Sequence, residues 1–136
     1  MAIRYLMLYL LTVPVFFALD LLWLGVVAKN LYRHNLAHLL SPSVNWPAAL
    51  MFYLVYIAGI LLFAVKPGLD ARSLARAVQW GALFGFFTYA TYDLTNLATI
   101  RGWPLKVALA DMAWGTLLCT LVGAASFLLG RWLKLG

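Results

Sequence analysis

Charge is scarce in this sequence, and negative charge is the scarcest. Only 10% of its 136 residues are charged, and the four acidic side chains are all aspartates. A soluble domain of this size exposes much of its surface to water, and a chain with 65% hydrophobic residues has too few polar groups for such a surface. We therefore expect a membrane protein.

Several other features are also missing. A single cysteine, Cys119, excludes an intramolecular disulfide framework. Transmembrane β-strands alternate apolar and polar residues, and the apolar runs of this chain do not alternate. The common motifs of nucleotide-binding proteins, serine hydrolases and zinc proteases are absent. The predicted fold class is an all-α integral membrane protein, and no cofactor is indicated.

Basic residues give the chain a formal net charge of +6. They stand singly between apolar runs and form no basic stripe, which favours anchoring at a membrane surface over binding to nucleic acid. The expected partners are therefore membrane lipids.

Four apolar blocks are long enough to cross a bilayer, which requires about 20 helical residues. They cover residues 5–27, 46–65, 78–100 and 105–129. We predict one domain, residues 1–136, folded as an up-down bundle of four transmembrane helices. The first block continues past Asp20 without a small-residue cleavage site, so we expect a retained helix rather than a signal peptide. Pro47 and Pro104 stand where helices are expected to begin.

The connections suggest how the bundle lies in the membrane. Residues 30–40 predict a short amphipathic helix at the interface, and Lys66-Pro67-Gly68 is expected to end the second helix. The N-terminal side of the bundle holds Arg4, Lys66, Arg72, Arg76, Arg131 and Lys134, and the opposite side holds Lys29, Arg33, Arg101 and Lys106. This excess favours N-in, C-in orientation in a bacterial inner membrane.

Three of the four aspartates, Asp20, Asp93 and Asp111, fall inside predicted membrane helices. One charge at the centre of such a helix costs about 2.5–3.5 kcal/mol, so the bundle must compensate for all three. The helical rise puts Asp20 and Asp93 about 22 Å from the starts of their helices, and Asp111 about 9 Å below the opposite surface. In a core about 30 Å thick, the three carboxyls therefore share one layer.

The neighbours of these aspartates favour a pocket. Helical spacing places Tyr89 and Asn96 on the same face as Asp93, with Tyr92 beside it. This face is too polar for lipid contact, so we expect it to point into the bundle.

Tryptophans follow the other two aspartates at the same spacing. Trp23 stands three residues after Asp20, and Trp114 three residues after Asp111, so each carboxyl is expected to have an indole donor on its own helix.

Groups at the nearer membrane surface could add to this layer. Arg101 and Lys106 could fold back toward the carboxyls, and His34 and His38 could cap them. The two histidines, at i and i+4, could also hold a metal with an aspartate, but a solvated interfacial helix explains them equally. No metal site is therefore predicted.

Structural interpretations remain open for the same residues. Buried aspartate and asparagine side chains can act only as hydrogen-bonding contacts between helices, and a protonated carboxyl can serve only as a donor. Trp46 and Trp103 fit an interfacial aromatic belt. Gly81 and Gly85 form a Gly-x-x-x-Gly pair suited to helix packing, which would also permit a homo-oligomer if exposed.

Five segments carry a resemblance to a known family: Asp20–Gly25 (DLLWLG), Asn45–Ala49 (NWPAA), Tyr89–Thr99 (YATYDLTNLAT), Gly102–Pro104 (GWP) and Asp111–Thr116 (DMAWGT). Over essentially its whole length the chain resembles small bacterial membrane proteins grouped as domain of unknown function 2177. The resemblance implies a membrane protein and favours lipid chemistry, without implying an activity.

These observations lead to a hypothesis of ligand binding inside the membrane. Asp20, Asp93, Asn96 and Asp111 would form the polar floor of a site for a small amphipathic or fatty-acyl ligand, oriented by Tyr89 and Tyr92 and walled by Trp23 and Trp114. If the protein is an enzyme, Asp93 is the expected acid or base, because its helix supplies the most hydrogen-bonding neighbours. The alternatives are a small proton-coupled transporter and an accessory subunit of a membrane complex.

Overall fold

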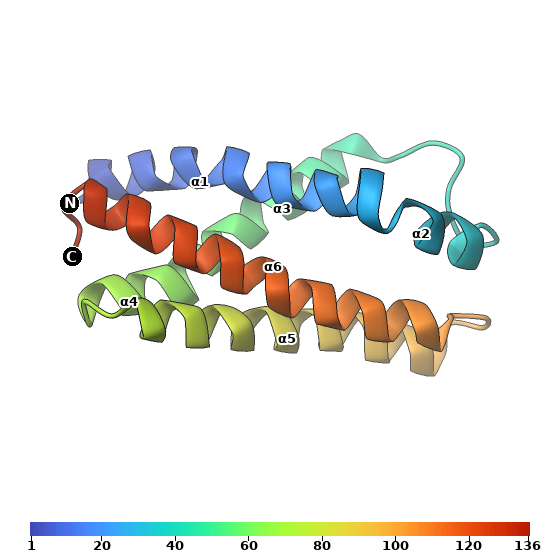
Figure 1. The fold of residues 1–136 in the computed structure, drawn as a ribbon. Coiled ribbons are helices and arrows are strands. Elements are labelled where there is room, and N and C mark those ends of the chain that lie inside the picture. Colours follow the sequence, from blue (N-terminus) through green and yellow to red (C-terminus); the bar gives the residue numbers. More distant parts are fainter.

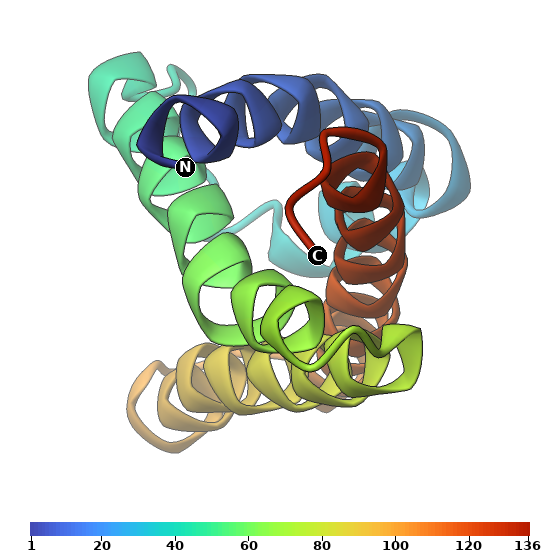
Figure 2. The same ribbon diagram turned by 90° about the vertical axis from the view of Figure 1, so that its left-hand side faces the viewer.

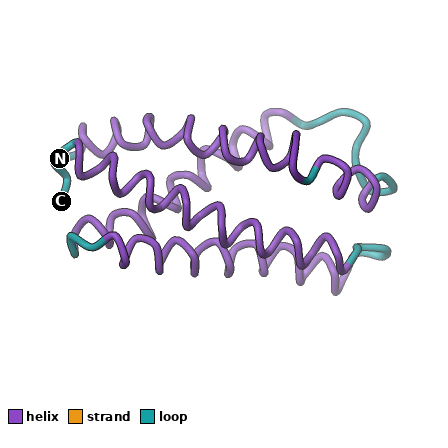
Figure 3. Tube along the Cα trace, viewed as in Figure 1, coloured by secondary structure: helices purple, strands orange, loops and turns teal.

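The computed structural model describes residues 1–136 and contains helices and no strands (Figure 3). The predicted all-α class is confirmed. Three helical stretches are long and apolar enough to cross a membrane, judged by length and composition: Ala2–Val27, Trp46–Asp70 and Leu105–Trp132.

The first stretch consists of α1 (Ala2–Leu22), which contains Pro14 and remains helical there, and the π-helical turn η1 (Trp23–Val27). α2 (Lys29–Leu36) follows almost directly. It is the expected short amphipathic helix, but it ends four residues earlier than predicted, because residues 37–39 form a turn.

The second stretch extends beyond its predicted end. It comprises α3 (Trp46–Ile60), the π-helical turn η2 (Leu61–Val65) and α4 (Lys66–Asp70). The expectation that Lys66-Pro67-Gly68 ends the helix was wrong. The wider turn of η2 lies directly before Pro67, where the ring would otherwise collide with the preceding helical turn, so the chain continues to Asp70.

The remaining helices are α5 (Leu74–Thr99) and α6 (Leu105–Trp132). α5 starts earlier than predicted because the Ser73 side chain caps it by accepting from the Arg76 N–H at 3.1 Å. Asn45 caps α3 in the same way, and Pro47 lies in the first turn of α3, as expected. Pro104 immediately precedes α6.

The helices run back and forth between two ends of an elongated bundle (Figure 1). Both termini and the α4–α5 turn lie at one end, and α2 and the α5–α6 turn lie at the other. α3 crosses obliquely, starting on the side of α1 and finishing beside α5 (Figures 1 and 2). Accordingly, α5 packs on η2 and α4 near the terminal end of the bundle.

Small residues bring α5 and α6 into the closest packing of the fold. A Cβ added to Gly81 would lie 2.6 Å from the Cys119 carbonyl oxygen, and one added to Gly85 would overlap the Gly115 carbonyl oxygen. The Gly-x-x-x-Gly pair is therefore a packing surface within the chain. Because both glycines are buried against α6, this pair is not exposed for a second copy of the protein.

Candidate functional site

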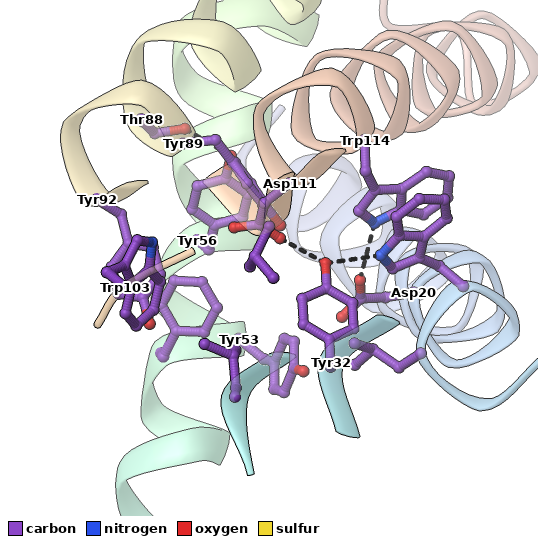
Figure 4. A pocket seen from close by; sticks show the side chains of 15 residues that line it. Asp20, Tyr32, Tyr53, Tyr56, Thr88, Tyr89, Tyr92, Trp103, Asp111 and Trp114 are labelled. Atoms are coloured by element: carbon purple, nitrogen blue, oxygen red, sulfur yellow. Dashed lines mark hydrogen bonds between the residues drawn. The ribbon is translucent and has the colours of Figure 1, made fainter. Parts of the chain in front are cut away.

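A cavity of about 550 Å³ lies in the half of the bundle that α2 covers. Every helix that reaches this end contributes to its wall. The lining residues are Asp20, Trp23, Leu24, Tyr32, Leu36, Phe52, Tyr53, Tyr56, Thr88, Tyr89, Tyr92, Trp103, Val107, Asp111 and Trp114 (Figure 4). We call this cavity the polar pocket, because two carboxyl groups face it from walls that are otherwise largely aromatic and aliphatic.

Asp20 and Asp111 each accept a hydrogen bond from an aromatic side chain of another helix (Figure 4). The Trp114 indole N–H donates to Asp20 Oδ1 at 3.2 Å. The Tyr32 hydroxyl donates to Asp111 Oδ1 at 2.6 Å and itself accepts from the Trp23 indole N–H at 2.9 Å.

The expectation that each aspartate pairs with the tryptophan on its own helix was therefore wrong. Each tryptophan instead pairs with the aspartate of the other helix. Trp114 donates to Asp20, and Trp23 donates to Tyr32, which in turn donates to Asp111. Spacing along a helix puts the paired residues on one face, but the closeness of α1 and α6 brings the carboxyl of the opposite helix within reach.

Tyr32 reaches this network from α2, outside the candidate spans. Burial raises the pKa of its phenol above the ordinary value, and the bond to Asp111 raises it further. The hydroxyl therefore remains protonated and keeps donating to Asp111.

Asp93 occupies a different position from the other two aspartates. Its side chain is fully buried and does not line the polar pocket. Its carboxyl group adjoins that of Asp111, and neither of its oxygens has a donor from elsewhere in the chain. Asp93 therefore lies behind Asp111, as viewed from the pocket.

The structure places some of the other predicted site residues in the pocket wall and one outside it. Tyr89 and Tyr92 line the pocket, whereas Asn96 is half-buried outside it. The structure thus brings Asp20, Asp111, both tryptophans and both tyrosines around one cavity.

No basic side chain folds into the carboxyl layer. Arg101 and Lys106 are exposed, and the ion pair in the structure joins Lys66 to Asp70 on the surface at 2.8 Å. The expectation that Arg101 and Lys106 turn back toward the aspartates was wrong, because their helix-end positions leave them in contact with solvent.

The histidines also lie away from the carboxyls. His34 is exposed, and the His38 ring Nε2 lies 3.0 Å from the Gly102 carbonyl oxygen. This contact ties the segment after α2 to the α5–α6 turn. No group of three metal-binding side chains is present.

Sequence reasoning missed Tyr32, Tyr53, Tyr56 and Trp103. Tyr53 and Tyr56 stand three residues apart on α3, a spacing that predicts that both side chains lie on one helix face. Trp103 is half-buried in the pocket wall, and its indole N–H is buried without a partner. Trp46, by contrast, is 62% exposed.

Part of the pocket wall reaches the outer surface of the bundle on α3 and α5. Phe52 of α3 and Tyr92 of α5 line the pocket yet are 50% and 56% exposed. Their exposure places an aromatic edge at the outer surface of the bundle, where a membrane helix contacts lipid.

Comparison with protein families supports the membrane assignment. The family model described as Predicted membrane protein (DUF2177) matches residues 5–128, which confirms the resemblance seen in the sequence. Comparisons with curated proteins and with solved structures found no match.

Proposed function

Since the chain belongs to the DUF2177 family of predicted membrane proteins, we propose that its polar pocket binds a small amphipathic, lipid-like molecule. The observation that carries this proposal is a cavity of about 550 Å³ with two carboxyl groups and otherwise largely apolar walls. A cavity of this size suits a small ligand, and a few polar groups among apolar ones orient such a ligand.

The proposed setting is a bacterial inner membrane, crossed four times with both termini inside. α5 would be the fourth span: its 26 residues extend about 39 Å, which exceeds the hydrocarbon thickness. It is less apolar than the other spans because its last turns carry Asp93, Asn96 and several threonines. The positions of both termini at one end of the bundle support an even number of crossings.

The exposed aromatic residues of the pocket wall on α3 and α5 support entry from the bilayer. A molecule with an apolar tail could enter past Phe52 and Tyr92 without crossing water, while its polar end reaches Asp20 and Asp111. Lipids of the surrounding leaflet are the nearest source of such molecules.

The test is mass spectrometry of small molecules that co-purify with the protein. Leu24→Trp adds bulk at the pocket wall, and Leu21→Trp on the same helix is the matched control, because Leu21 is 61% exposed and does not line the pocket. We expect wild type and Leu21→Trp to carry the same molecule, and Leu24→Trp to carry several-fold less. Equal occupancy in all three, or no molecule above the detergent background, would contradict the proposal.

Chemical modification of the ligand is a second candidate function, favoured by the closeness of the carboxyls of Asp93 and Asp111. Asp111 faces the pocket, so Asp93 would exchange a proton with a ligand through Asp111. A strain lacking the protein should then show a changed lipid class, restored by wild type but not by Asp93→Asn.

Proton transport is the alternative that uses the same carboxyl pair. Vesicles containing the protein would show a proton flux that Asp93→Asn abolishes. An accessory role in a membrane complex predicts neither a lipid change nor a flux.

A further inference from the structure

The polar pocket contains negative groups and no positive ones. Asp20 and Asp111 line it, and none of its lining residues is lysine, arginine or histidine. The Lys66–Asp70 ion pair lies at the other end of the bundle. The carboxyls of the pocket therefore have no cation within the chain to neutralise them.

The hydrogen-bond donors near these carboxyls leave acceptor sites open. Trp114 donates to one oxygen of Asp20, and Tyr32 donates to one oxygen of Asp111. A carboxylate offers about four acceptor positions, so capacity remains on both groups. An incoming phosphate or carboxylate head group would meet like charge, whereas an N–H donor or a cation would be attracted.

Asp93 adds to this imbalance. It is completely buried, its two oxygens lack donors, and it lies against Asp111. Three acidic side chains thus lie in one region without a basic partner, an arrangement whose cost in a membrane a bound positive charge would reduce.

The rest of the wall is suited to a cation as well. Nine of the lining residues are aromatic: Trp23, Tyr32, Phe52, Tyr53, Tyr56, Tyr89, Tyr92, Trp103 and Trp114. The faces of such rings attract ammonium groups within about 6 Å, and several aromatic rings around one cavity can hold quaternary ammonium ligands. The same rings offer apolar contact to an alkyl tail.

We propose that the ligand of the polar pocket is a lipophilic amine or quaternary ammonium, its positive group held between Asp20 and Asp111 and its apolar part along the aromatic wall. This inference rests on the proposed function and specifies its ligand class. A fatty acid or a phosphate monoester is accordingly a poor ligand.

The test compares three probes that share an eight-carbon chain: octyltrimethylammonium, octanoate and octanol. Binding to the full-length protein in dodecyl maltoside is followed by tryptophan fluorescence, since Trp23, Trp103 and Trp114 line the pocket, and by thermal unfolding. We expect saturable binding of the cation at least about tenfold tighter than that of the other two, a difference equivalent to about 1.4 kcal/mol.

Substitutions of the pocket aspartates test whether the cation binds beside them. Asp20→Asn and Asp111→Asn, singly and together, should weaken binding of the cation by about tenfold or more. Asp70→Asn removes an exposed carboxyl at the other end and should leave binding unchanged. Circular dichroism confirms that each variant is folded, and the comparison of the three probes on wild type stands without any variant.

The outcomes separate this inference from the proposed function. Octanoate or octanol binding as tightly as the cation, or equal cation binding by the carboxyl variants, would overturn the inference while leaving a lipid-binding pocket in place. Absence of saturable binding by all three probes, together with no co-purifying molecule, would overturn both.

Discussion

The indole rings of Trp23 and Trp114 stack face to face, with centroids 4.7 Å apart and planes 3° from parallel. They come from opposite ends of the chain and join α1–η1 to α6. Stacking orients the two N–H groups toward different carboxyls, Trp114 to Asp20 and Trp23 to Asp111 through Tyr32. The stacked pair therefore connects the first and last long helices of the bundle and positions hydrogen-bond donors near the carboxyl groups of the pocket.

Trp114→Phe should test the contribution of the bond to Asp20. Phenylalanine keeps much of the ring contact with Trp23 but removes the N–H donor, so the free energy of unfolding should fall by about 1 kcal/mol. Thermal unfolding in detergent measures the effect. Trp132→Phe is the matched control, because Trp132 is 73% exposed and should tolerate the same change; an equal loss in both variants would contradict the bond's role.

Tyr32→Phe should loosen α2 from the pocket. The change removes both the donor to Asp111 and the acceptor for Trp23, leaving two half-buried polar groups without this partner. Hydrogen–deuterium exchange should become faster across residues 29–36. Tyr5→Phe, near the opposite end of the bundle, should leave exchange in this segment unaltered, and unaltered exchange in Tyr32→Phe would show that other contacts hold α2.

Gly85→Ala should destabilise the protein by roughly 1–3 kcal/mol, because its Cβ would overlap the Gly115 carbonyl oxygen and force α5 away from α6. Gly25→Ala introduces the same methyl group where no atom lies within 4 Å. Unfolding temperatures of the two variants give the comparison. Similar temperatures would mean that α5 and α6 are farther apart than the structure has them.

Asp93→Asn should stabilise the purified protein even if it abolishes function. The amide cannot become charged beside Asp111 and always has an N–H to donate to it, a gain of about 1 kcal/mol. The unfolding temperature should rise, while Asp70→Asn, which breaks only an exposed ion pair, should change it little. A lower unfolding temperature for Asp93→Asn would contradict this account of the Asp93–Asp111 pair.

The sequence alone determined the helical membrane character and the grouping of the aspartates. Both depend on local periodic quantities, because a helix rises by a fixed amount per residue and a bilayer has a fixed thickness. Counting along the chain therefore sufficed to expect Asp20, Asp93 and Asp111 at one depth, and the structure gathers them at the α2 end of the bundle.

Only the tertiary structure decided which partner each carboxyl has. Depth along a helix says nothing about how neighbouring helices are rotated and how closely they approach, and these are set by side-chain packing such as the glycine contacts of α5 and α6. For this reason the sequence did not show that Trp114 donates to Asp20 or that Trp23 reaches Asp111 through Tyr32 of α2. It also did not show that Asp93 lies behind Asp111 rather than in the pocket.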